Sequence, residues 1–354
     1  MGAPSHEPRP VDTSAASPSD MDDRDLLDAL KARWKAGDTR LRPLVEGLDD
    51  LNHGVLGAFR EADDKANALQ RSYRRCAFRS TLAGAIAVMF GLFQLAHWES
   101  PLIVAGEFIF AVASLGYALY GVLSDTRERW LLERALAERL RARKFASLLD
   151  PRLWQESTRA DWTHEVAHLA DDFPPGTHNF LEDWTLHQTM PRTVAAPEPV
   201  DRAVADELRL YYRRQRIGGQ IAYLTARAPE EHHREVKWKL VGLTLFYTSV
   251  GAVFAHALLS IARGEHDVER ILVYIAAGAP AMAAVVRTYR AGREFGRNAL
   301  RHTATLTTLR ELDHQLERAT TTAGIFSLIG ACEQVLEADT REWMRLMKET
   351  EWFG

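Results

Sequence analysis

The most prominent feature of the sequence is a set of four long apolar segments, grouped in two pairs. The first pair covers 81–98 and 101–124, and the second covers 240–262 and 271–288. A helix that spans a bilayer needs about 20 predominantly apolar residues. All four segments meet or approach this length, and they lack the polar face that buried helices of soluble bundles usually keep. The pattern predicts four transmembrane helices in two hairpins.

The charged residues around these segments predict how the chain crosses the membrane. The outer flanks of both pairs are rich in Arg and Lys, whereas the turn at 99–100 has neither, and the turn at 263–270 carries two Arg against two Glu and one Asp. Basic flanks stay on the cytoplasmic side. We therefore expect a protein of the bacterial inner (plasma) membrane with both termini in the cytoplasm.

Outside the apolar segments the hydrophobic periodicity is helical. Residues 127–149 form a strongly amphipathic pattern, and 290–319 and 323–348 are also expected to be helices, while no convincing strand is found. The predicted fold class is all-α, an integral membrane protein with long amphipathic cytoplasmic helices.

Two polar stretches predict the domain organisation. Residues 1–20 are rich in Pro, Ser and Ala and lack the apolar core of a signal peptide, which is typical of a disordered tail. Residues 171–200 hold five prolines and are expected to be a linker. The linker separates two repeats, 21–170 and 201–350, each with a cytoplasmic helix, a membrane hairpin and a charged exit helix.

Composition adds few constraints. A net charge of −4 gives no overall signal for nucleic acid, so no duplex DNA binding is expected. The two cysteines, Cys76 and Cys332, are far apart in the chain and form neither a disulfide framework nor a CxxC metal motif. The sequence predicts no cofactor.

Three polar residues fall inside the apolar segments at similar depth. Glu107 lies six residues after Pro101, about 9 Å along a helix from the hairpin turn. Gln94 and His256 also lie near the ends of their segments that are beside a hairpin turn. An ionisable group inside a membrane is costly and usually faces a bundle interior or water. These side chains are therefore candidates for a polar ring that lines a cation path. In the alternative interpretation, Glu107 snorkels outward or is protonated against Gln94 or His256 and holds helices together.

The many arginines near the membrane have a simple interpretation. Most of them set the topology and bind anionic lipid headgroups. Arg213, Arg214 and Arg216 are candidate contacts for a phosphorylated ligand, because guanidinium groups bind phosphate well.

One short motif suggests different chemistry. His164, Glu165 and His168 form an HExxH sequence, in which two His on one helix face bind zinc and the Glu acts as general base. Its position between two hairpins resembles membrane zinc metalloproteases of the HtpX kind, with Glu294 where that family supplies its third ligand. Asn298 stands where that family has an Asp. The alternative is a pair of histidines on a helix surface.

Three stretches carry a further resemblance. They are "WLLERALAERLRARKF", "RIGGQIAYLTARAPEEHHREVKWK" and "FSLIGACEQVLEADTREWMRL", each beside a predicted hairpin. Together they resemble the bacterial SLATT family, two-span effector domains associated with SMODS nucleotidyltransferase and SLOG sensor genes. The chain is similar to two such domains in tandem.

This resemblance implies a membrane effector of anti-phage defence by abortive infection. Such an effector would form a homo-oligomeric pore in the lipid bilayer and depolarise the membrane. Its expected trigger is a nucleotide second messenger or a nucleotidyltransferase partner. The family has no catalytic residues, so no enzyme activity is implied. The zinc metalloprotease, and a scaffold that only anchors partners, are the alternatives.

Overall fold

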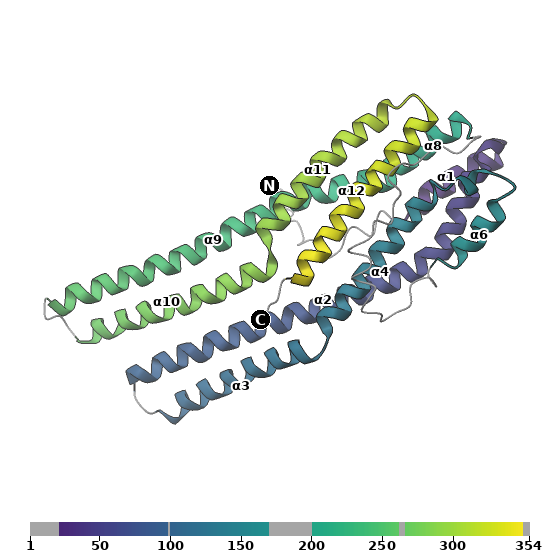
Figure 1. The fold of residues 1–354 in the computed structure, drawn as a ribbon. Coiled ribbons are helices and arrows are strands. Elements are labelled where there is room, and N and C mark those ends of the chain that lie inside the picture. The colour runs from purple at the N-terminus through teal and green to yellow at the C-terminus, as the bar shows by residue number, and fades with distance from the viewer. Residues whose placement is uncertain (1–20, 98–99, 170–199, 262–265, 350–354) are drawn as a thin grey trace, which may run out of the picture. The chain divides into compact units, whose positions relative to one another are not determined.

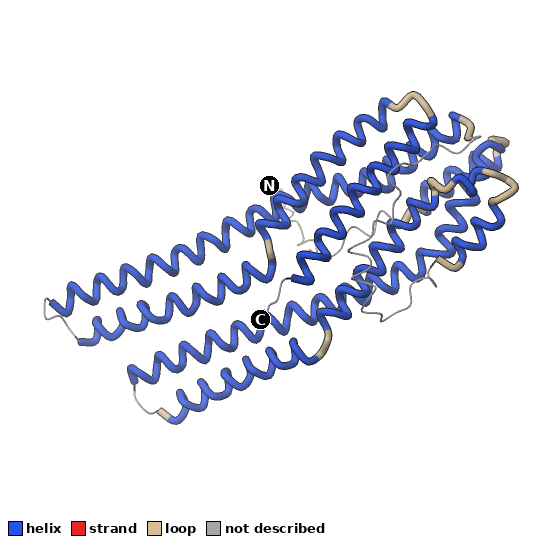
Figure 2. Tube along the Cα trace, viewed as in Figure 1, coloured by secondary structure: helices blue, strands red, loops and turns tan. Residues whose placement is uncertain are grey.

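The computed structural model describes residues 21–97, 100–169, 200–261 and 266–349. Within these ranges the chain is helical and contains no strand (Figures 1 and 2). The predicted all-α fold class is therefore confirmed. The predicted tail, 1–20, and nearly all of the predicted linker, 171–200, lie outside the described residues.

The helices follow one another with short connections. In the first half they are α1 (Arg24–Lys35), η2 (Thr39–Leu41), α2 (Arg42–His97), α3 (Pro101–Leu123), α4 (Thr126–Ser147), α5 (Pro151–Trp154) and α6 (Arg159–Ala167). In the second half they are α8 (Arg202–Tyr212), η3 (Arg213–Ile217), α9 (Gly218–Ile261), α10 (His266–Arg293), α11 (Phe295–Arg318) and α12 (Thr322–Glu349). The four predicted apolar segments lie in α2, α3, α9 and α10, which are long and apolar enough to cross a membrane.

Each half breaks its helical path at one acidic residue. Asp125 (φ 47°) separates α3 from α4, and Glu294 (φ 50°) separates α10 from α11. A non-glycine residue rarely adopts positive φ, and one such residue ends a helix and redirects the chain. Both breaks therefore lie where a membrane helix gives way to a charged helix.

The chain forms two compact units, each of which takes segments from both halves of the sequence. The described part of unit 1 covers 21–70, 132–169, 200–223 and 308–340. Unit 2 covers 71–97, 100–131, 224–261, 266–307 and 341–349. The division into two sequence repeats stays a prediction.

Unit 1 is a helical bundle with a dense apolar core. Leu44, Leu48 and Leu51 of α2 are fully buried, and so are Phe326 of α12 and Tyr212 of α8. Helix α6 lies very close to α2, since a Cβ at Gly54 would be 2.4 Å from the carbonyl oxygen of Val166. Glycine is therefore required where these two backbones meet.

Unit 2 contains two helical hairpins, α2 with α3 and α9 with α10 (Figure 1). Their apolar side chains point outward: Leu102 is 82% exposed, Phe108 69% and Ile261 82%. Contiguous exposed apolar surface of this kind marks contact with lipid or protein. Together with the four spans, it identifies a membrane protein.

Candidate functional site

The α2–α3 hairpin is held by polar contacts inside an apolar surrounding. The Ser80 hydroxyl donates to the Ser114 carbonyl oxygen at 3.0 Å. In return, the Ser114 hydroxyl donates to the Ser80 carbonyl oxygen at 2.9 Å. Nearer the turn, Gln94 Nε2 donates to Glu107 Oε2 at 2.5 Å. Hydrogen bonds between small polar side chains commonly join membrane helices. The two contacts fix the register of α3 against α2.

Glu107 faces α2. Its Oε1 lies 3.2 Å from the position that a Cβ at Gly91 would occupy, so the carboxylate rests directly on this glycine. Outward snorkelling of Glu107 is therefore wrong, because Gln94 and Gly91 hold the side chain between the helices. The contact between Gln94 and Glu107 is one of the two contacts named in the alternative interpretation. The protonation of Glu107 and the lining of a cation path both stay predictions.

His256 is separate from this pair. It lies on α9, its Nδ1 is buried, and among the described residues that atom has no hydrogen-bond partner. The structure gives Gln94 and Glu107 a bond to each other and none to His256 within the part of the chain that it describes. The predicted layer of three side chains is therefore a bonded pair and one isolated imidazole.

The second hairpin is held by its own hydrogen bond and packs against the first. Within it, Ser249 of α9 donates to the carbonyl oxygen of Ala276 of α10 at 2.7 Å. The rings of Phe93 and Tyr274 stack with their centroids 6.2 Å apart. The Met89 sulfur lies 3.1 Å from where a Cβ at Gly278 would be. All four spans thus pack within unit 2.

The HExxH motif forms no metal site in the described residues. His164 and His168 are exposed at α6, with ring centroids 4.9 Å apart, as their spacing predicts. Glu165 pairs with Arg152 at 2.6 Å, and Glu294 belongs to unit 2, where it pairs with Arg297 at 2.9 Å. No group of three His, Cys, Asp or Glu suited to a metal occurs within the described ranges.

The three candidate arginines do not form one binding surface. Arg216 is 4% exposed, and its guanidinium binds both oxygens of Glu333 at 2.9 and 3.1 Å. Arg213 forms a similar two-bond pair with Asp313 at 2.7 and 3.0 Å. These carboxylates occupy two donors of each guanidinium, and Arg216 is buried, so the contacts give no support to a phosphate role for Arg213 or Arg216. Arg214 is exposed, and the phosphate role of the three arginines stays a prediction.

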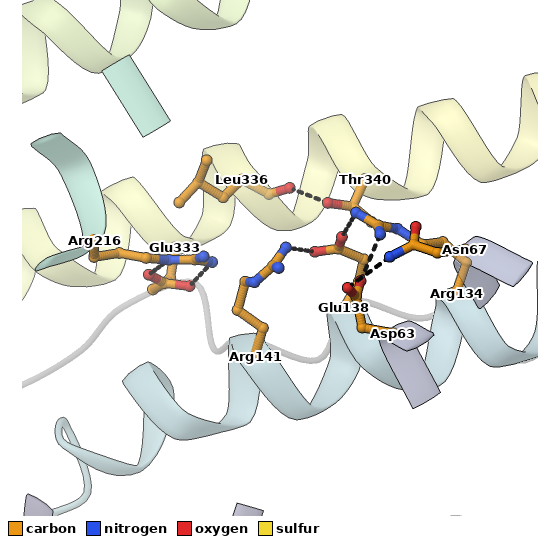
Figure 3. Close-up of polar contacts among 9 residues, drawn as sticks. All are labelled: Asp63, Asn67, Arg134, Glu138, Arg141, Arg216, Glu333, Leu336 and Thr340. Atoms are coloured by element: carbon orange, nitrogen blue, oxygen red, sulfur yellow. Dashed lines mark hydrogen bonds and ion pairs between the residues drawn. The ribbon is translucent and has the colours of Figure 1, made fainter. Parts of the chain in front are cut away.

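A buried ionic network lies in unit 1 instead. Arg134 of α4 donates to Asp63 of α2 at 2.8 Å and also bonds to Glu138 one turn later (Figure 3). Glu138 accepts a second bond from Arg141 at 2.7 Å. Arg141 is 1% exposed, so α4 buries the charged face that its amphipathic pattern places in solvent. Figure 3 shows the Arg216–Glu333 pair in the same region.

A second buried ion pair, between Lys144 and Asp23, links α4 to the first residues that the structure describes. The Lys144 ammonium lies 3.0 Å from Asp23 and donates to the carbonyl oxygen of Met21 at 3.2 Å. Asp23 also accepts from Asn52 Nδ2 at 2.7 Å and from the Tyr211 hydroxyl. Lys144 is fully buried and Asp23 is 2% exposed. Buried charges of this kind are tolerated only when they are paired and hydrogen-bonded.

The turn that follows α8 joins both clusters. η3 is a π-helical turn, and its residues Gln215, Arg216 and Ile217 are all buried. An ordinary helix seldom buries three consecutive side chains, because each step rotates by 100°. Gln215 donates to the carbonyl oxygen of Asp22 at 2.8 Å, and Arg216 binds Glu333. π-Helical turns often occur at functional positions.

The network changes the acidity of its members. Burial opposes ionisation of Glu138, but Arg141, Arg134 and Arg216 outweigh it and lower the pKa of Glu138 from 4.5 to about 2. Burial, with Glu333 next in the chain, raises the pKa of the Cys332 thiol. Glu138 is therefore ionised in the fold, and Cys332 is a neutral, unreactive thiol.

The lowered pKa of Glu138 predicts an acid-dependent loss of stability. A carboxylate whose folded pKa is depressed stabilises the fold above its unfolded pKa, and the contribution is lost as the pH falls from about 4.5 toward about 2. In urea titrations, the stability difference between wild type and Glu138→Gln should be large at pH 6 and shrink below pH 4.5. Glu61→Gln, at an exposed pair with Lys65, should change little. A constant difference for Glu138→Gln would contradict the assignment.

Sequence reasoning missed this network. It assigned the arginines after α3 to membrane topology, whereas the structure buries Arg134, Arg141 and Lys144. One signal was present, because Arg134, Glu138 and Arg141 are spaced at i, i+4 and i+7 and therefore share one helix face. The other partners, Asp63, Glu333 and Asp23, are distant in sequence, and no local pattern identifies them.

Comparison with known families identifies part of the chain. Residues 212–343, less than half of the chain, match the family model of the SMODS and SLOG-associating 2TM effector domain 1. The predicted SLATT resemblance is confirmed there. The match includes the α9–α10 hairpin and most of α12, but none of the first hairpin, so the tandem arrangement stays a prediction. SLATT domains are effector domains associated with anti-phage defence systems. No curated protein and no solved structure matches the chain.

Proposed function

We propose that the protein is a pore-forming effector of bacterial anti-phage defence that depolarises the inner membrane. The observation that carries the proposal is the half-buried Gln94–Glu107 pair, which lies between two membrane-spanning segments whose other side chains are mostly apolar. An ionisable group in this position is costly, and membrane proteins keep such groups mainly for ion or substrate paths. The SLATT match supports an effector role for the same chain.

The proposed pore is a homo-oligomer. Four spans packed by Phe93 against Tyr274 and by Met89 against Gly278 leave little space for water inside one chain. An ion path therefore requires several copies, with the Gln94–Glu107 pairs arranged around it as a ring of polar groups that selects cations. The exposed apolar faces of α3 and α9 are the available surfaces for such contacts.

The proposed trigger acts on the cytoplasmic unit. The basic flanks of the spans predict that both termini lie in the cytoplasm. A nucleotide second messenger or a nucleotidyltransferase partner is the expected signal. Exposed Arg214 belongs to the π-helical turn, and this turn directly precedes α9, which continues into the third span. A conformational change caused by ligand binding to unit 1 would be transmitted to the spans through continuous helices. The proposal assigns no catalytic residue.

The test is ion flux through purified protein in liposomes that carry a potassium gradient, alongside membrane potential in expressing cells. We expect wild type to dissipate the gradient when its trigger is present, and Glu107→Ala to reduce the rate by at least tenfold. Glu107→Gln keeps the hydrogen-bonding shape and separates the role of the charge from that of packing. The double variant His164→Ala, His168→Ala is the control and should conduct like wild type. Equal ion flux from wild type and Glu107→Ala would show that the Glu107 carboxylate does not line the ion path.

A further inference from the structure

One face of α9 forms a groove at the basic end of the third apolar segment. Its volume is about 500 Å³. The lining residues recur at helical spacing along a single face: His233, Val236, Lys237, Leu240, Val241, Thr244 and Leu245. The groove therefore runs along the helix, from the charged region that precedes the span into the span itself.

The two ends of the groove differ in chemistry. His233 and Lys237 stand at one end, and Leu240, Val241 and Leu245 line the remainder. The 12 residue steps from His233 to Leu245 cover about 18 Å of helix. Half of a bilayer's hydrocarbon core is about 15 Å thick. The apolar part, from Leu240 to Leu245, covers five of these steps, about 7.5 Å. A cationic end followed by an apolar stripe of this length matches the headgroup and the first half of an acyl chain of one phospholipid in one leaflet.

The Lys237 ammonium at the groove is available to an external anion. Two nearby charges on other faces of α9 are paired within the protein: Arg234 bonds to Glu230 at 2.6 Å, and Glu235 pairs with Arg290 at 3.1 Å. Lys237 and His233 are exposed, and neither has a hydrogen bond or an ion pair among the residues that the structure describes. Lys239 is exposed as well but lies outside the groove, so Lys237 is the lysine that the groove presents.

Aromatic rings place this end of the groove at headgroup level. Lys237 Nζ lies 5.8 Å from the ring centroid of Trp238, which packs edge-on against Tyr289 at 5.0 Å. The Arg293 guanidinium lies 5.5 Å from the Tyr289 centroid. Trp and Tyr concentrate at the boundary between hydrocarbon and headgroups, and Lys and Arg concentrate just beyond it. Lys237 is therefore at the depth where a lipid phosphate lies.

We propose that the α9 groove is a binding site for one anionic phospholipid. The lipid phosphate contacts Lys237 and His233, and one acyl chain lies along Leu240, Val241 and Leu245. This site is independent of the proposed pore, because it depends only on membrane insertion.

The test is native mass spectrometry of the full-length protein purified in detergent, with added dioleoyl phosphatidylglycerol or dioleoyl phosphatidylcholine. Wild type should retain one phosphatidylglycerol per chain and bind phosphatidylcholine more weakly. Lys237→Gln should weaken phosphatidylglycerol binding about fivefold, the effect expected from about 1 kcal/mol per Lys at an anionic surface. The matched control is Lys239→Gln, the same change two residues along α9 and outside the groove, which should leave binding unchanged.

A second pair of variants tests the acyl chain. Thr244→Trp places a large side chain in the groove and should weaken binding comparably, whereas Leu243→Trp, at an exposed position outside it, should not. Equal effects of Lys237→Gln and Lys239→Gln would show general charge attraction and overturn the proposal. Equal retention of both lipids, or full binding by Thr244→Trp, would overturn it as well.

Discussion

Replacing Glu333 with Ala is expected to lower the free energy of unfolding by about 3–5 kcal/mol, the usual cost of leaving a buried charge without its partner. Glu333 is 1% exposed and accepts two bonds from Arg216 and one from the Tyr212 hydroxyl at 2.7 Å. Its removal leaves the Arg216 guanidinium desolvated above the ring of Phe145, 4.8 Å from the centroid. A cation–π contact does not replace the lost carboxylate.

The measurement is urea unfolding in detergent micelles, followed by circular dichroism. Glu342→Ala is the control, because this residue of the same helix, α12, is 47% exposed and its pair with Arg345 at 3.3 Å is screened by water. The double variant Arg216→Met, Glu333→Leu removes both charges and should recover most of the lost stability. A double variant as unstable as Glu333→Ala would show that packing, and not the unpaired charge, causes the loss.

The membrane half of the fold was predictable because it depends on local composition. Spans in α2, α3, α9 and α10 follow from uninterrupted apolar length, which needs no knowledge of partners. The contact between Gln94 and Glu107 was one of the stated alternatives, since both lie at the same depth in one hairpin. The sequence did not predict that α2 is a single helix of 56 residues, which continues from unit 1 into unit 2.

The charges outside the spans were harder to assign, because a position beside a membrane span favours a topological role. Whether Arg134 or Lys144 is buried depends on Asp63 and Asp23, which are 71 and 121 residues away in the chain. The π-helical turn at Arg213–Ile217 was likewise unpredictable, because it buries three neighbouring side chains against parts of the chain that are distant in sequence. Its bonds to Glu333 and to the carbonyl oxygen of Asp22 occur only in the folded unit.

The second large effect is expected at Asp23. Asp23→Ala should lower the free energy of unfolding by about 3–5 kcal/mol, because it removes the carboxylate that lies 3.0 Å from the fully buried Lys144 ammonium. It also removes the acceptor of Asn52 and Tyr211. Asp22→Ala is the neighbouring control, since the Asp22 carboxylate is 53% exposed and pairs with exposed Arg24.

Limited trypsin digestion separates local release from global unfolding at this site. Local opening exposes a backbone to protease without loss of the whole fold. If Asp23 fastens only the start of the chain, Asp23→Ala should be cleaved after Arg24 at least tenfold faster than wild type, while its urea midpoint stays close to that of wild type. If the cluster supports the entire bundle, the midpoint falls as well, and cleavage spreads to α4 and α8. Because Lys144 of α4 and Tyr211 of α8 both bind Asp23, we expect the second pattern. Lys144→Met combined with Asp23→Ala should then regain stability relative to Asp23→Ala alone, since the uncompensated charge is the main cost.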